Sequence, residues 1–276
     1  KKLNCEYNDQ VKNVNHLKDT LEILKCEGDC GIDQNGICEL KYIKKLEISR
    51  NEKITDVNHL KNTLEVLKCS GKNCGIGQNG INELIHIRKL YCSDNKNLNN
   101  VNHLKNTLKI LDCSGDKCGI NQKGISELLH IEKLYCDENI NIDDVNYLKN
   151  TLKILNCEGD CGINQKGISE LQYVEELECS SNSKINNVNH LKNVLKVLNC
   201  KYDCGINQNG ISELGCLEKF ICDENKKINN VNHLKNTLNL LFCGNACGID
   251  QNGISELKQI VVLSCYNNNK INNVNH

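Results

Sequence analysis

A repeat of 43 or 44 residues runs through the whole chain of 276 residues. It is most regular between Leu90 and Ile131, where the sequence reads LYCSDNKNLNNVNHLKNTLKILDCSGDKCGINQKGISELLHI, and nearly the same string occurs six times. A repeat of this kind is a unit that buries its apolar side only by stacking on its neighbours. No linker, composition shift or block of charge divides the chain. The repeat therefore predicts one elongated solenoid domain over residues 1–276.

Each repeat consists of a short unit and a long unit. The short unit has the pattern LxCxxNxxIxxVxxL, and the long unit has LxxLxC followed by CGI and GIxxLxxI. The seven short units begin near Lys1, Lys44, Arg88, Glu132, Glu175, Glu218 and Val261. The six long units begin at Leu21, Leu64, Leu108, Leu152, Leu195 and Leu238.

Both units resemble the leucine-rich repeat, whose pattern is LxxLxLxxN/CxL within about 20 to 29 residues. The resemblance covers the whole chain. It implies an α/β solenoid with the horseshoe shape of that family and a parallel β-sheet of about 13 strands on the concave side. We expect the convex side to alternate short α-helices in the long units with 3₁₀ or extended segments in the short units, which have too few residues for a helix.

Alternation within the xLxC segments predicts that Leu and Cys point into the coil and that their neighbours point outward. Cysteine occupies the inward position in all six long units, and Ile48 replaces it in one short unit. As core groups these thiols behave as small hydrophobes. The inward cysteines are Cys5, Cys26, Cys69, Cys92, Cys113, Cys136, Cys157, Cys179, Cys200, Cys222, Cys243 and Cys265.

Asparagine follows the strand in every short unit, where an inward amide can pair backbone groups that the bend leaves open. This asparagine ladder comprises Asn8, Asn51, Asn95, Asn139, Asn182, Asn225 and Asn268. In the long units the position is cysteine, as in the cysteine variant of the repeat, after one or two extra residues that predict a bulge: Cys30, Cys74, Cys118, Cys161, Cys204 and Cys247. The expected helices would begin after Asp33, Gly77, Asn121, Asn164, Asn207 and Asp250.

The 20 cysteines allow three interpretations: reduced core thiols, disulfides or metal ligands. Pairs such as Cys26 and Cys30 are explained by the repeat and lack the two closely spaced pairs of a zinc site. We favour reduced thiols, no metal and no cofactor, although neighbouring strand cysteines would lie near disulfide distance. Cys38 and Cys216 break the repeat and should be the most accessible. No Asn-x-Ser/Thr sequon occurs, and we expect a reducing, cytoplasmic location.

Histidine and glutamate also recur in rows. His16, His59, His103, His190, His233 and His276 stand in VNHL, with Tyr147 at the remaining position. Alternate coils lie about 9.6 Å apart, too far for two imidazoles to share one ion, so we interpret this row as solvated or hydrogen-bonded. Active sites are singular, whereas Glu39, Glu83, Glu127, Glu170, Glu213 and Glu256 repeat identically. With no nucleophile elbow, phosphate loop or helical zinc motif, we expect no enzymatic activity.

Charge and hydropathy exclude further partners. The formal net charge of −1 gives no reason to expect nucleic acid, and no run of eighteen apolar residues could span a membrane. The N-terminus lacks the apolar segment of a secretory signal. The chain begins without Met and stops inside a repeat, so we expect it to be a fragment of a longer array.

Function should depend on outward positions where the repeats differ. The central outward row is Asn4, Lys25, Glu47, Lys68, Tyr91, Asp112, Tyr135, Asn156, Glu178, Asn199, Ile221, Phe242 and Ser264. Protein interfaces concentrate aromatic and apolar anchors among polar neighbours. We therefore expect a protein or peptide to bind the concave sheet at Tyr91, Tyr135, Ile221 and Phe242, with Lys89 and Lys133 in the row before. The alternative is that β-branched and aromatic residues simply suit strands.

Two other hypotheses stand beside an interaction module. Neither end shows a polar capping repeat, so copies could stack end to end as a structural or assembly protein. The thiols could also serve as a redox or metal store. The repeat sequence is rich in Asn, Lys and Ile and contains VNHLKNTLKIL. In this it is similar to the repeats of leucine-rich repeat proteins of giant viruses of amoebae, a resemblance that implies action in a host cytoplasm.

Overall fold

The computed structural model describes residues 1–274 and contains two compact units, Lys1–Tyr135 and Cys136–His276. In the first unit the strands are β1 (Lys2–Asn4), β2 (Ile23–Lys25), β3 (Lys45–Glu47), β4 (Val66–Lys68), β5 (Lys89–Tyr91), β6 (Ile110–Asp112) and β7 (Lys133–Tyr135). In the second they are β8 (Ile154–Asn156), β9 (Glu176–Glu178), β10 (Val197–Asn199), β11 (Lys219–Ile221), β12 (Leu240–Phe242) and β13 (Val262–Ser264). The thirteen predicted strands are confirmed within the described residues.

Within each unit, successive strands pair in parallel with their repeat positions in register. The middle residue of strands β2 to β12, such as Leu90, is buried, while Lys89 and Tyr91 on either side point outward. Cys92 then continues the ladder inward, and its N–H donates to the carbonyl of Asp112 in the next coil. The inward positions of Leu and Cys follow the predicted alternation.

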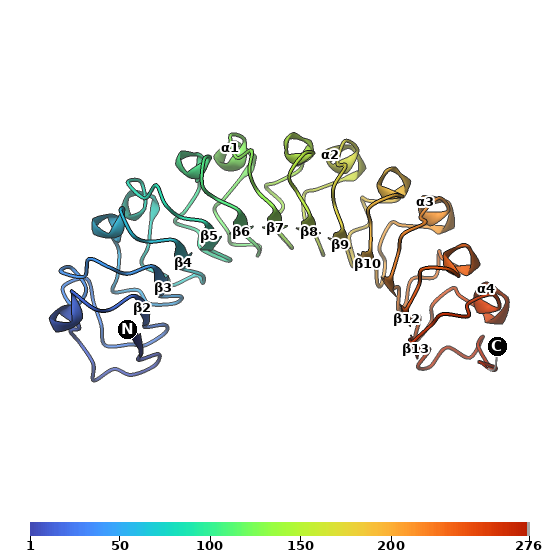
Figure 1. Ribbon diagram of the computed structural model, residues 1–276, viewed down its shortest axis with the longest axis horizontal. Coiled ribbons are helices and arrows are strands. Elements are labelled where there is room, and N and C mark those ends of the chain that lie inside the picture. The colour runs from blue at the N-terminus through green and yellow to red at the C-terminus, as the bar shows by residue number, and fades with distance from the viewer. Residues whose placement is uncertain (275–276) are drawn as a thin grey trace. The chain divides into compact units, whose positions relative to one another are not determined.

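The opposite side of each unit carries short helical turns (Figure 1). In the short units these are 3₁₀ helices, as predicted: η1 (Asn15–Leu17), η2 (Asn58–Leu60), η4 (Asn102–Leu104), η5 (Asn146–Leu148), η6 (Asn189–Leu191) and η7 (Asn232–Leu234). Four long units have the expected α-helices: α1 (Gln122–Ile125), α2 (Gln165–Ile168), α3 (Gln208–Ile211) and α4 (Gln251–Ile254). No helix within residues 1–274 is long and apolar enough to cross a bilayer.

The prediction of an α-helix in every long unit is wrong for the first two. The second long unit forms the 3₁₀ helix η3 (Gln78–Gly80), and the first forms only a turn. At the N-cap position of α1, the side chain of Asn121 accepts a hydrogen bond from Gly124 N. Gly77 has no side chain to do the same for η3, so this turn lacks the side-chain cap.

The predicted asparagine ladder joins a short unit to the long unit before it. The amide of Asn95 donates to the carbonyls of Cys69 and Ile76, at 2.9 and 3.1 Å. Its side-chain oxygen accepts from Asn97 N at 2.9 Å. Asn51, Asn182, Asn225 and Asn268 make the same contacts. The amide thus satisfies buried carbonyls that the turn after the strand leaves without a ladder partner.

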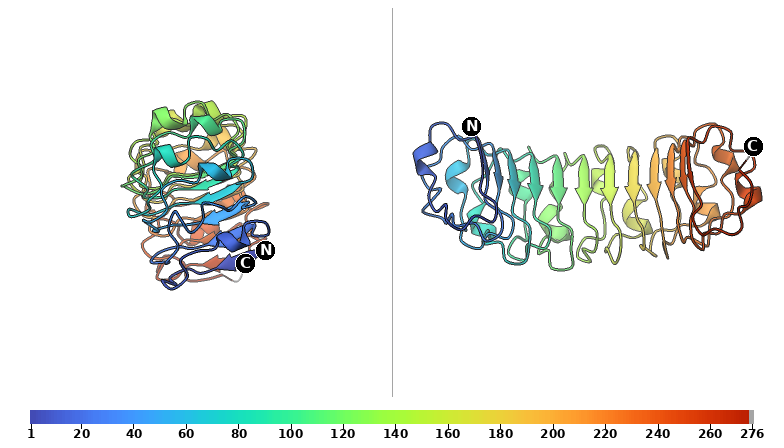
Figure 2. Two further views of the ribbon diagram at one scale, coloured as in Figure 1. Left: turned by 90° about the vertical axis from the view of Figure 1, so that its left-hand side faces the viewer. Right: turned by 90° about the horizontal axis from the view of Figure 1, so that it is seen from below.

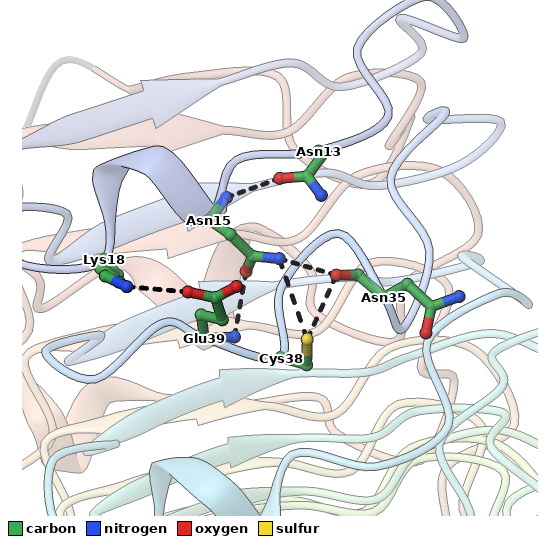
Figure 3. Close-up of polar contacts among 6 residues, drawn as sticks. All are labelled: Asn13, Asn15, Lys18, Asn35, Cys38 and Glu39. Atoms are coloured by element: carbon green, nitrogen blue, oxygen red, sulfur yellow. Dashed lines mark hydrogen bonds and ion pairs between the residues drawn. The ribbon is translucent and has the colours of Figure 1, made fainter.

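A second asparagine ladder, not expected from the sequence, joins each of the first six short units to the long unit after it. The Asn15 amide donates to Asn35 O at 2.7 Å and its oxygen accepts from Glu39 N at 3.0 Å (Figure 3). Lys18 bonds the carboxylate of the same Glu39 at 2.8 Å. The pattern returns at Asn58, Asn102, Asn146, Asn189 and Asn232. The recurring VNHL motif was its visible signal.

Candidate protein-binding face

The strands of each unit lie side by side (Figure 2, right). We call the face formed by their outward side chains the sheet face. Its central row is confirmed by the strand register. In the first unit this row runs Asn4, Lys25, Glu47, Lys68, Tyr91, Asp112 and Tyr135. In the second it runs Asn156, Glu178, Asn199, Ile221, Phe242 and Ser264.

On the first unit the two predicted tyrosines are separated by one acidic residue. Tyr91 and Tyr135 are the register partners of Asp112 on either side, and both rings are partly exposed. Lys68, the other register neighbour of Tyr91, lies with its Nζ 5.4 Å from the ring centroid. A cation near the face of an aromatic ring is attracted to it, so Lys68 restrains the Tyr91 ring.

The predicted lysines occupy the row before the tyrosines. Lys89 is exposed and Lys133 is partly exposed, and Ile110 pairs with both in the register. A partner would therefore meet an aliphatic side chain between two cations, beside two aromatic rings. The four predicted residues of this unit lie on β5 and β7, the two strands on either side of β6.

A cluster of three lysines around Glu47 was not recognised from the sequence. The Glu47 side chain is only 3% exposed, and its oxygens lie 2.7 Å from Lys25 Nζ and 2.6 Å from Lys45 Nζ. Lys68 Nζ lies 3.6 Å away. Burial alone would raise the pKa of Glu47, but hydrogen bonds to Lys25 and Lys45 and the charge of Lys68 outweigh burial and lower it to about 2. The sequence did contain a signal for this cluster, because Lys25 and Lys68 flank Glu47 in the central row.

On the second unit the predicted anchors are direct neighbours. Ile221 and Phe242 are register partners, and both are partly exposed. Leu240 pairs with Lys219 in the row before. Ile221 also pairs with Asn199, which begins a polar stretch of the central row. This unit therefore places an apolar patch beside a polar one on the same face.

The cysteines line the interior. Most are buried, Cys38 is exposed and Cys216 is partly exposed, as expected, and Cys265 in the last described coil is also partly exposed. The extra residues before the second cysteine of a long unit contain a left-handed residue at the place of the predicted bulge, for example Gly28 with φ 64°. The N–H of Gly28 still donates to Ser49 O at 2.8 Å, so the inter-coil ladder continues through this turn.

The histidine and glutamate rows have structural partners. Nε2 of His59, His103 and His233 lies 3.0 to 3.1 Å from an isoleucine carbonyl of the preceding coil. Lysines of the short units bond Glu83, Glu127, Glu170, Glu213 and Glu256 at 2.6 to 2.9 Å. His276 lies outside the described residues. Within residues 1–274, no three His, Cys, Asp or Glu side chains converge as metal ligands would.

The comparisons with known proteins support the fold. No protein-family model and no curated protein sequence matches the chain. Among solved structures, an internalin, InlF of Listeria monocytogenes, superposes with a TM-score of 0.70 at 21% identity, over 99% of this chain and 82% of the internalin. The functional domain of Listeria InlJ, described as including a cysteine ladder, gives 0.65 at 21% identity, over 95% of this chain and 57% of that one.

Yeast Rad7, solved in complex with Elc1, is a more distant match, with a TM-score of 0.51 at 16% identity over 91% of this chain and 71% of the other. At these identities the likeness concerns the fold alone. The internalins are leucine-rich repeat proteins. The chain accordingly has the fold of a leucine-rich repeat solenoid, built from alternating short and long units.

Proposed function

We propose that this protein is a non-enzymatic interaction module that binds a protein or peptide on its sheet face. Tyr91, Tyr135, Lys89 and Lys133 would make the contacts on the first unit, and Ile221 and Phe242 those on the second. One observation carries the proposal. The inward residues, amide ladders and ion pairs repeat from coil to coil, whereas the central outward row changes at every strand.

The chemistry of this row fits protein recognition. Aromatic and large apolar side chains supply most of the energy of protein interfaces when polar neighbours surround them. Side chains that repeat in every coil have a structural role, because they join stacked coils. Tyr91 and Phe242 lie on the outward side of the sheet and contribute little to the core. Rad7, which shares the fold, was solved with a protein partner.

Partner capture from a lysate of the source or host cell tests the proposal. The variant carries Tyr91→Ser, Tyr135→Ser, Ile221→Ser and Phe242→Ser, and captured proteins are identified by mass spectrometry. The matched control carries Tyr42→Ser, Ile85→Ser, Leu129→Ser and Tyr173→Ser, which remove side chains that are 51 to 57% exposed but lie outside the strands. We expect the first variant alone to lose the partner, with both circular dichroism spectra unchanged. Undiminished capture of the partner by the first variant would contradict the proposal.

A second candidate function is end-to-end self-association. Val261, Tyr266 and Val274 in the last described coil are 55 to 79% exposed, beside a cavity of about 310 Å³ lined by Leu257, Leu263 and Cys265. However, each pair of neighbouring strands in the described sheet joins a short unit to a long one, whereas the first and last described coils are both short. Sedimentation velocity that gives a monomer at about 100 μM would contradict self-association.

We also propose that the protein works in a reducing compartment, such as a host cytoplasm. The buried cysteines support this, because closely spaced thiols in the core need protection from oxidation. Mass spectrometry of protein isolated under acid quench tests the idea. Intramolecular disulfides in freshly isolated protein would contradict it.

A further inference from the structure

The sheet face of the second unit joins an acidic patch to an apolar one. Along the central row, Glu178 is followed by Asn199, Ile221 and Phe242 on successive strands. Neighbouring strands are about 4.8 Å apart, so Glu178 and Ile221 are separated by about 10 Å. Glu176 lies on the same strand as Glu178, and its register partner Val197 precedes Asn199 on the next strand. One short partner segment could therefore touch both patches.

The acidic patch consists of Glu158, Glu176 and Glu178. Asn156 donates to Glu178 Oε2 and Asn199 donates to Glu158 Oε1, both at 3.2 Å. These amides hold the carboxylates in place but carry no charge. Burial and the neighbouring carboxylates of Glu158 and Glu176 raise the pKa of Glu178. The patch therefore concentrates negative charge, which the nearby charge of Lys201 offsets only in part.

No ion pair within residues 1–274 involves Glu158, Glu176 or Glu178. The ion pairs among the described residues of the second unit involve other carboxylates: Glu170, Glu175, Glu213 and Glu256. The charge of Lys201 lowers the pKa of Glu178 without outweighing burial, and Lys201 Nζ lies 5.6 Å from the Tyr202 ring centroid.

Glu47 on the first unit is a carboxylate of the central row that residues of the same unit neutralise. Three lysines surround Glu47 at 2.6 to 3.6 Å. Glu178 occupies the same row of the repeat but pairs in the register with Asn156 and Asn199. Glu47 is therefore neutralised by lysines of its own unit, whereas Glu178 has only uncharged neighbours in its row and can still pair with a cation of a partner.

We propose that the sheet face of the second unit binds a segment of a protein partner in which a Lys or Arg side chain lies about 10 Å from an aromatic or aliphatic side chain. The cation bonds Glu158 and Glu178, and the apolar group packs on Ile221 and Phe242. This spacing corresponds to about three residues in an extended segment or seven in a helix. The inference rests on the proposed function and specifies the chemistry of its partner.

A metal ion is a poorer occupant of the patch than a basic side chain. Asn156 and Asn199 direct N–H donors at the carboxylate oxygens, and a metal would have to displace these donors. A guanidinium or ammonium group needs only the remaining lone pairs of the carboxylates. The adjoining apolar patch also has no use in metal binding, whereas it completes a protein interface.

A library of random 12-residue peptides displayed on phage provides the probe. Peptides selected on the wild-type protein are measured by fluorescence anisotropy against three variants. The first carries Glu158→Gln and Glu178→Gln, and the second carries Ile221→Ser and Phe242→Ser. The third, with Glu170→Gln and Glu213→Gln, changes the net charge equally at ion pairs away from the sheet.

We expect the selected peptides to combine Lys or Arg with an apolar residue, and to bind each of the first two variants at least about tenfold more weakly. The third variant should bind within about twofold of the wild type. Peptides that depend on Ile221 and Phe242 but bind the glutamine variant of the patch equally well would overturn this inference and leave the proposed function standing. Selection of no peptide that depends on any sheet-face residue would contradict both.

Discussion

The Sγ atoms of Cys179 and Cys204 lie 3.7 Å apart although 25 residues separate them in sequence. Cys179 follows a strand of a short unit, and Cys204 follows the strand of the next long unit. The same contact, at 3.8 Å, joins Cys5 to Cys30, Cys136 to Cys161 and Cys222 to Cys247. A disulfide has its sulfurs about 2.05 Å apart, so these are packed thiols. Stacked coils therefore place sulfur on sulfur inside the core.

This packing predicts a wide range of thiol reactivity. Burial raises the pKa of the Cys157, Cys200 and Cys222 thiols, which disfavours the reactive thiolate. A short iodoacetamide pulse read by mass spectrometry should label Cys38 first, then Cys216 and Cys265. The buried thiols should react more than about a hundredfold more slowly until the protein is unfolded. Rapid labelling of Cys92 in the native protein would contradict the packed interior.

The local part of the fold could be predicted from the sequence because each coil repeats one pattern. Alternation placed Leu90 and Cys92 inside and Tyr91 outside, and the asparagine after the strand had a backbone role. Features that depend on contacts between coils were harder to predict from the sequence. The lysine cluster at Glu47 arises only when strands β2 to β4 align in register, and the Cys5–Cys30 contact needs two coils stacked. The absence of an α-helix from the first two long units does not follow from the cap residue alone, because Asp33 accepts from Gly36 N as a cap does and only a turn forms there.

The asparagine ladder should contribute strongly to stability. Asn95→Ala leaves the carbonyls of Cys69 and Ile76 without a donor, which should lower the free energy of unfolding by about 3 kcal/mol. Asn8 is the matched control, because it stands at the same repeat position but its side-chain oxygen accepts only from the nearby N–H groups of Gln10 and Val11. Asn8→Ala should cost about 0.5 kcal/mol. Urea unfolding followed by circular dichroism compares them, and equal losses would refute the ladder's role.

Close approach between coils should make Gly124 intolerant of any side chain. A Cβ at this position would collide with the carbonyl oxygen of Asn99 in the preceding short unit. Because backbone cannot yield as a flexible side chain can, Gly124→Ala should cost about 3 kcal/mol or more. Gly215, where a Cβ meets no atom within 4 Å, is the control, and Gly215→Ala should change stability by less than about 1 kcal/mol. Thermal unfolding that ranks the two variants equally would contradict the tight stacking.

The histidine row should make stability fall as the pH is lowered. Burial lowers the pKa of His59, His103 and His233 in the folded protein, despite the opposing effect of the hydrogen bond that each ring makes to a carbonyl. The unfolded chain therefore binds protons more readily, so this contribution is complete above a pH of about 6.5 and is lost as the pH falls below that value.

Replacing these three histidines by Gln should flatten the dependence of the unfolding free energy on pH between 7.5 and 5.0. His16 is the natural control for this change, because it stands in the first short unit, is exposed, and has no preceding coil in the described structure to supply a carbonyl. Urea titrations of His16→Gln should retain the wild-type slope with pH. A triple variant whose stability still falls as steeply as that of the wild type would show that the row does not couple protons to folding.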